Sequence, residues 1–145
     1  MSRAVTDTLD QVLQLVVLFA DDARRGLARV GLTLPRAHLG WVLHHEGPKT
    51  QRELADALGV TPRNVTGLVD GLAGTGFVTR EPHPTDRRAF RVSLTEQGSS
   101  VLAEMDREHR ALAELLFGEL SAPELEAFAA GLDHVVCRLH EAVGR

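Results

Sequence analysis

Apolar side chains recur every three or four positions along most of the chain, which predicts a mainly α-helical protein. The first such stretch extends from Val5 to Val30, about seven helical turns, and ends at Gly31. A helix of this length exceeds what a small core can cover, so we expect a partner element or a partner subunit to share it. Shorter helices are expected over residues 35–45, 50–58 and 61–74, and long ones over residues 95–117 and 121–143.

Helix start signals mark several of these boundaries. Thr50 and Glu53 have the capping-box spacing, in which each side chain satisfies a backbone N–H of the first turn. Ser121 and Glu124 repeat this spacing before the last helix. Thr61 is followed by a proline, a favourable start because proline at the first helical position lacks only an N–H that would have no helical partner.

The middle of the chain combines two short helices with a hairpin. The helices that begin at Thr50 and Thr61 are separated by a Leu-Gly-Val turn, the spacing of a helix-turn-helix. Phe77–Arg80 and Arg91–Leu94 are expected to be strands, joined by the polar, proline-rich loop Pro82–Ala89. Because two strands alone are marginally stable, we expect this hairpin to pack against the helices.

The expected fold class is therefore mainly α: a winged helix-turn-helix with a two-stranded wing and long N- and C-terminal helices that form a dimerisation lobe. We expect one unit over residues 1–145. Within it, residues 34–95 would form the winged-helix DNA-binding lobe, and residues 1–33 and 96–145 the helical dimerisation lobe.

Charge is unevenly distributed along the chain. The formal net charge is −4, yet the stretch from Thr61 to Val92 has five arginines against three carboxylates, a net charge of +2. An acidic protein with a local basic surface can bind DNA, because neutralisation of nearby phosphates matters more than total charge. Tyrosine is absent and aromatic residues are 4% of the chain, which argues against a single-strand binder that stacks bases.

Other classes of function find little support in the sequence. The single cysteine, Cys137, excludes an intramolecular disulfide, and no signal peptide or 18-residue apolar run is present. We therefore expect a cytoplasmic protein that has no contact with a membrane. A nucleophile elbow, a phosphate-binding glycine loop and metal-ligand spacing are all missing, so we expect no enzyme, no cofactor and no resident metal.

One face of the helix after Thr61 has the side chains of a DNA-recognition helix. At 100° per residue, Arg63, Asn64 and Thr66 lie opposite the apolar face and close to the N-terminus. Arginine pairs well with guanine and asparagine with adenine, so Thr61 and these three residues are the candidate base and phosphate contacts. A solvated helix face is the alternative. Phosphate would repel Asp70, which we therefore expect to brace an arginine of the wing.

The most specific motif follows in the second half of the hairpin. Asp86-Arg87-Arg88, then Val92-Ser93-Leu94-Thr95 and Gly98, is similar to the D-R-R…V-x-L-T-x-x-G signature of the MarR family of bacterial transcriptional regulators. Two further segments match the same family, namely Thr50-Gln51-x-Glu53-Leu54-Ala55 and Gly76-Phe77-Val78-x-Arg80. The chain resembles this family along nearly its whole length in the order of its elements.

The resemblance implies a homodimer whose first and last helices interleave. Each subunit would set a recognition helix into the major groove and a wing tip against the minor groove of double-stranded DNA at a pseudo-palindromic operator. Arg87 or Arg88 would enter the minor groove, while the other arginine or Asp86 braces the loop. An exposed charged loop or a salt bridge within the subunit is the alternative, and which arginine enters the groove stays open.

The resemblance also implies a repressor that releases DNA when a small molecule, often a phenolic or other aromatic acid, binds between the two lobes. His38, Trp41 and His45 lie one turn apart on the second helix. Together with His109 they are the candidate pocket, because an aromatic wall with polar tips suits a flat organic anion. Core packing of Trp41 is an equally open interpretation.

Three other interpretations compete with a ligand-released repressor. A metal-responsive regulator would use His44, His45 and Glu46 of the second helix together with His109, but His44 and His45 are adjacent, point about 100° apart on a helix and do not easily share one ion. A redox regulator would use Cys137, which we expect to be an inert thiol buried at a dimer interface beside Val135 and Val136. A winged-helix protein-interaction module is the third, and the paired wing arginines argue against it.

Overall fold

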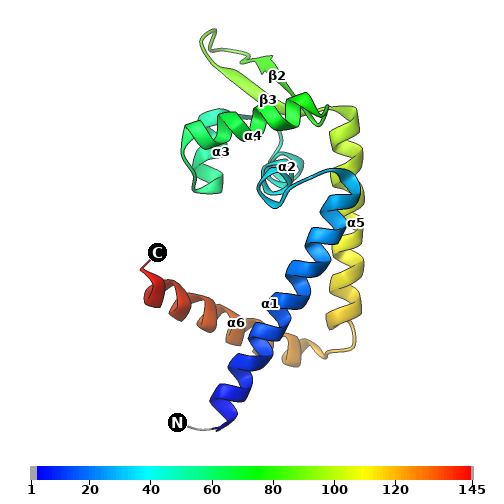
Figure 1. The fold of residues 1–145 in the computed structure, drawn as a ribbon, viewed down its shortest axis with the longest axis vertical. Helices are drawn as coiled ribbons and strands as arrows, with labels where there is room; N and C mark the ends of the chain where they lie inside the picture. The colour runs from blue at the N-terminus through cyan, green and yellow to red at the C-terminus, as the bar shows by residue number, and fades with distance from the viewer. Residues whose placement is uncertain (1–2, 145) are drawn as a thin grey trace. The chain divides into compact units, whose positions relative to one another are not determined.

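The computed structural model describes residues 3–144, and in this part of the chain it contains six helices and three short strands (Figure 1). In chain order they are α1 (Arg3–Val30), α2 (Leu34–Glu46), β1 (Lys49–Thr50), α3 (Gln51–Leu58), α4 (Pro62–Gly74), β2 (Val78–Pro82), β3 (Phe90–Leu94), α5 (Glu96–Phe117) and α6 (Ala122–Val143). The predicted mainly α fold with a helix-turn-helix and a wing is confirmed. Among the described residues, none of the helices is both long and apolar enough to cross a membrane.

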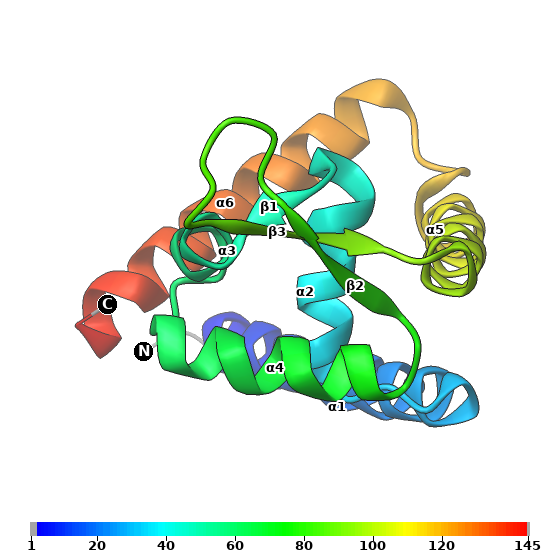
Figure 2. The ribbon, with the colours of Figure 1, turned by 90° about the horizontal axis from the view of Figure 1, so that it is seen from above.

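The chain divides into two compact units, Met1–Glu104 and Met105–Arg145. In the first unit, α2, α3 and α4 lie on one side of the β2–β3 hairpin, and Figure 2 shows β2 and β3 crossing over α2. These elements and the start of α5 contribute the fully buried side chains of the core, which are Leu39, Leu54, Val65, Val69, Leu72, Val92 and Leu102. The predicted assignment of residues to a DNA-binding and a dimerisation lobe stays a prediction.

The sheet has three strands rather than the predicted two. β1 pairs antiparallel with β3, in the order β1-β3-β2, and aligns Lys49 with Val92. The hairpin itself pairs Val78 with Leu94 at one end and Pro82 with Phe90 at the other. β1 has only two residues, too few for any alternation of apolar and polar positions, so the sequence pattern could not reveal it. The extra strand gives the wing support that an isolated hairpin lacks.

The predicted helix starts are confirmed by their hydrogen bonds. The Thr61 hydroxyl accepts the Asn64 N–H at 3.2 Å, and Ser121 and Glu124 form a capping box at the start of α6. Between α3 and α4, Gly59 has φ of +65°, a left-handed conformation that glycine adopts without strain. The turn of the helix-turn-helix therefore depends on this glycine.

A junction of hydrogen bonds fixes the base of the wing to the start of α5. The Thr95 hydroxyl donates to the Gly76 carbonyl at 2.5 Å, and the Thr95 N–H donates to the Phe77 carbonyl at 3.0 Å. The same hydroxyl accepts the Gly98 N–H at 3.0 Å, so Thr95 also caps α5. Gly98 is buried, and a Cβ there would overlap the Phe77 carbonyl. The V-x-L-T-x-x-G motif thus has a structural role, because its threonine and glycine join both ends of the hairpin to the next helix.

The second unit leaves most of its side chains exposed. Phe117, at the end of α5, and Phe128, in α6, have ring centroids 5.8 Å apart. No residue of α6 is buried, although the helix has an apolar stripe at close to heptad spacing, made of Leu125, Phe128, Leu132, Val135, Val136, Leu139 and Val143. In the first unit, α1 likewise buries only Leu27. Both helices have apolar faces that the chain does not cover by itself.

We predict that Gly98→Ala lowers the free energy of unfolding by about 2–3 kcal/mol, because the methyl group forces α5 away from the Phe77 carbonyl. Thermal or urea unfolding of the full chain measures this change. Gly67→Ala is the matched control: nothing lies within 4 Å of a Cβ at that position, so it should be neutral or stabilise α4 by up to about 1 kcal/mol. Equal stability of Gly98→Ala and the wild type would contradict the tight contact.

Candidate nucleic-acid interface

The N-terminal half of α4 presents the predicted recognition face to solvent. Val65 and Val69 are fully buried and fix the rotation of the helix. Arg63 and Asn64 are exposed near the helix N-terminus. This end of the helix has a partial positive charge and favours phosphate. The arrangement matches what a helix needs to reach base edges from a major groove.

Thr66 is exposed but already has partners within the chain. Its hydroxyl lies 3.1 Å from the Pro62 carbonyl and 3.4 Å from Oε1 of Gln51, the first residue of α3. The side chain therefore connects the two helices of the motif as well as facing solvent. Gln51, which was quoted above only as part of the motif that begins at Thr50, therefore also belongs to this face.

Gly71 and Gly67 have different reasons to be glycine. The guanidinium of Arg36, from α2, lies across α4 at Gly71, where a Cβ would come within 2.5 Å of the Arg36 Cζ. Around Gly67 there is open space instead. Gly71 therefore allows Arg36 to pack closely against α4, whereas Gly67 leaves its part of the exposed face without a side chain.

Asp70 forms an ion pair with Arg80 of β2. The contact joins the exposed side of α4 to the first strand of the wing. Asp70 therefore braces an arginine of the wing strand, and in the structure this arginine is Arg80 rather than Arg87 or Arg88 at the tip.

The loop between β2 and β3, residues 83–89, presents the two tip arginines on a tight turn. The Ala89 N–H donates to the Asp86 carbonyl at 3.2 Å, which closes a turn with Arg87 and Arg88 at its two central positions. The Asp86 carboxylate accepts the Arg88 N–H at 3.0 Å, as expected for a residue that braces the loop. Both arginine side chains are exposed.

His83 is a second organiser of this loop, and the sequence analysis did not identify it. Its ring Nδ1 accepts the N–H groups of Thr85 at 3.2 Å and Asp86 at 3.1 Å. The backbone N–H of His83 donates to the Ala89 carbonyl at 3.1 Å. A histidine between two prolines in a polar loop carries no sequence signal for this role, because the bonds depend on the path of the folded loop.

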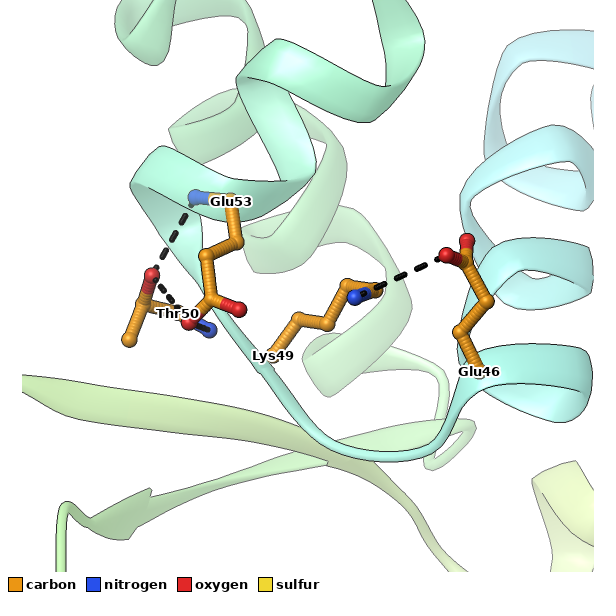
Figure 3. Close-up of polar contacts among 4 residues, drawn as sticks. All are labelled: Glu46, Lys49, Thr50 and Glu53. Carbon is orange, nitrogen blue, oxygen red and sulfur yellow. Dashed lines mark hydrogen bonds and ion pairs between the residues drawn. The ribbon is translucent and has the colours of Figure 1, made fainter.

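The start of α3 lies next to the wing and contains a charged capping box (Figure 3). Glu53 Oε1 accepts from the Thr50 hydroxyl at 3.0 Å and from the Thr50 N–H at 3.3 Å. These two bonds lower the pKa of Glu53, the side-chain bond most; burial opposes them, and the nearby charge of Lys49 lowers the pKa a little further. Lys49 also lies 3.7 Å from Glu46 Oε1, which connects the end of α2 to β1.

The predicted pocket residues lie partly together. The rings of Trp41 and His45 have centroids 4.6 Å apart, and that of His44 lies 5.0 Å from His45. Trp41 is half-buried, whereas His38 and His45 are exposed. His109 belongs to the second unit, so a pocket made of all four predicted residues stays a prediction.

An apolar hollow of about 310 Å³ lies elsewhere, where α1 meets α2. Its lining does not include the predicted pocket residues and consists of Ala20, Ala23, Arg24, Leu27, Ala28, Leu32, Thr33 and Leu34. Of these, Arg24 brings a charge, and it is already paired with Asp21 at 2.7 Å.

Cys137 is exposed, and its Sγ lies 4.0 Å from Glu141 Oε1. Five positions after Leu132, it is about 140° around the helix from the apolar stripe. The expectation that it sits on the apolar side beside Val135 and Val136 is therefore wrong, because neighbours in sequence point to different sides of a helix.

Comparison with known proteins agrees with this geometry. Residues 32–90 match the model of the MarR family. Over 82 residues, 57% of this chain, the sequence is 38% identical to the HTH-type transcriptional repressor NicR of Pseudomonas putida. The chain spans about half the length of this curated relative, 52%.

Two solved structures share the fold. Streptococcus pneumoniae FabT in complex with DNA superposes with a TM-score of 0.78 at 21% identity, covering 97% of this chain and 98% of that one. AbsC, a MarR family transcriptional regulator from Streptomyces coelicolor, gives a TM-score of 0.73 at 21% identity and covers 97% of both chains. The chain therefore shares the fold of these two proteins along nearly its whole length.

We predict that the capping box makes stability depend on pH through Glu53. Its pKa is lowered in the folded chain, so its contribution is present above the usual carboxyl value of 4.5 and is lost as the pH falls through the lowered value. Glu53→Gln keeps the shape and removes the charge. The substitution should lower the free energy of unfolding by roughly 0.5 kcal/mol near neutral pH and by almost nothing in acid.

Unfolding by urea between pH 3 and 7 checks this, with Glu108→Gln as the control, since Glu108 is an exposed glutamate that caps no helix. A Glu53→Gln deficit that stays constant over this range would contradict the charge-based account.

Proposed function

We propose, from the premise that residues 32–90 are a MarR-family winged helix, that the chain binds duplex DNA as a homodimer and represses transcription. The observation that carries this proposal is the exposed pair Arg87 and Arg88 on a turn fixed by Asp86. The proposed contacts to base edges and phosphates are those of α4: Thr61, Arg63, Asn64 and Thr66. The complex of FabT with DNA supports the proposed DNA binding, and the description of NicR as a transcriptional repressor supports the proposed repression.

The wing arginines suit a minor groove. Narrow A·T-rich minor grooves concentrate negative potential, and arginine is the side chain that such grooves attract. The Asp70–Arg80 pair joins α4 to the wing strand, so α4 in the major groove and the wing tip beside it would approach DNA as one rigid surface. Such a surface would hold the base-reading side chains in a fixed orientation, which sequence-specific binding requires.

A second copy of the chain is the proposed cover for α1 and α6. The exposed large apolar side chains of these helices are 40–67% exposed, among them Leu9, Val16, Leu132 and Leu139. An apolar stripe repeated over a whole helix is typical of a helix–helix interface. Dimerisation would also supply a second winged helix, which a pseudo-palindromic operator requires.

Release by a small aromatic acid is the finer part of the proposal. Trp41 and His45 form an aromatic pair with a polar edge on α2, the helix over which β2 and β3 cross (Figure 2). A ligand that binds only one arrangement of the two recognition helices would shift the dimer away from half-sites one helical turn, ~34 Å, apart. As a regulator of this kind the protein would work on DNA in the cytoplasm.

We predict that the double variant Arg87→Ala/Arg88→Ala binds duplex DNA at least roughly tenfold more weakly, because contacts to the minor groove and phosphates are lost. The slope of log affinity against log salt should fall by about 1 for each arginine that contacts phosphate. Fluorescence anisotropy on a duplex selected by the wild type from a random pool gives both quantities.

Arg29→Ala is the control for this experiment, since Arg29 is exposed in the last turn of α1 and belongs to neither the helix-turn-helix nor the wing. It should bind as the wild type does. If the double variant bound DNA with the affinity of the wild type, the proposed contact between the wing and DNA would be contradicted.

We also predict that Leu132→Lys converts the dimer to a monomer, since a charge in the apolar stripe of α6 must be buried without a partner. Sedimentation at micromolar concentration measures the mass. His134→Lys, on the other side of α6, should leave the dimer intact. A monomeric wild type, or a dimeric Leu132→Lys variant, would speak against α6 as the interface.

A further inference from the structure

We propose that His83 is a positioning residue for DNA binding: its neutral imidazole ring fixes the turn that presents Arg87 and Arg88. The inference rests on the proposed function, because positioning the arginines matters only if the wing contacts DNA.

The ring acts as a hydrogen-bond acceptor. Nδ1 receives the Thr85 N–H at 3.2 Å and the Asp86 N–H at 3.1 Å. Only an unprotonated Nδ1 can accept, so the ring carries its hydrogen on Nε2. In this respect His83 does for its loop what a capping aspartate or asparagine does for a turn.

The effect of the ring reaches the arginines in two steps. First, the Asp86 N–H is fixed by His83, which places the first residue of the turn. Second, the Asp86 carboxylate accepts the Arg88 N–H at 3.0 Å and its carbonyl accepts the Ala89 N–H at 3.2 Å. Arg87 and Arg88 occupy the middle of a turn whose start depends on the histidine.

The remaining contacts explain why a small loop can be ordered without glycine. The backbone N–H of His83 donates to the Ala89 carbonyl at 3.1 Å and closes the loop at its base. His83 is half-buried, so its ring is partly shielded from solvent.

Removal of the ring acceptor should change order more than stability. The Thr85 and Asp86 N–H groups are exposed enough to bond to water instead, so the chain stays folded. The loop then samples several shapes, and the apparent affinity for DNA falls by the fraction of molecules in the competent shape. A loss of roughly tenfold corresponds to the two missing bonds.

The test compares three variants of the full chain on a duplex that the wild type selects from a random pool. His83→Ala removes the acceptor and should lose roughly tenfold in affinity. His83→Asn places an oxygen at the position of Nδ1 and should bind within about threefold of the wild type. His83→Gln places its oxygen one bond further out and should behave like His83→Ala. All three should keep the melting temperature and oligomeric state of the wild type.

NMR of the free protein supplies a readout that needs no DNA. The ¹⁵N spectrum should show Nδ1 of His83 unprotonated, and the Thr85 and Asp86 amides should exchange more slowly in the wild type and His83→Asn than in His83→Ala. A protonated Nδ1, or equal exchange in all variants, would overturn the proposal.

The affinities separate this inference from the proposed function. Undiminished binding by His83→Ala, or failure of His83→Asn to restore binding, would overturn the role of His83 and leave DNA binding intact. A wild type that binds no duplex from the pool would overturn the proposed function itself.

Discussion

The junction at Thr95 is the constraint on which the wing depends. A three-stranded sheet whose outer strand β1 has two residues would not hold a fixed direction alone. The Thr95 hydroxyl and N–H bind the two carbonyls at the start of the hairpin, and Gly98 allows α5 to come against them. Both ends of the hairpin therefore meet at one point. The Asp70–Arg80 pair adds a second link, between the wing and α4.

This rigid unit explains how an acidic chain can act on DNA. The formal net charge is −4, so attraction to phosphate cannot come from the protein as a whole. The structure instead places two exposed arginines on a short turn and a third, Arg63, at the N-terminal end of α4, opposite the buried face of that helix. A single such surface is small, and in the proposed homodimer the uncovered apolar stripes on α1 and α6 would bring a second copy of it.

Much of the fold could be predicted from the sequence because local chemistry determines it. Thr50, Thr61 and Ser121 cap helices where their spacing predicted, and the apolar faces of α3 and α4 are buried. Features that depend on the folded path were missed. β1 is too short to show a pattern, and the partner of Asp70 is an arginine ten positions away across a turn. The function of His83 arises only when the loop brings Nδ1 to two amides.

A footprint of the wild-type protein on duplex DNA tests the central claim, that paired winged helices recognise sequence. Hydroxyl-radical cleavage of a duplex selected from a random pool should show two protected segments centred about 10 base pairs apart, with further protection in the flanking minor grooves. A candidate aromatic acid that acts as ligand should remove both segments together. One protected segment, or uniform cleavage at saturating protein, would contradict the account.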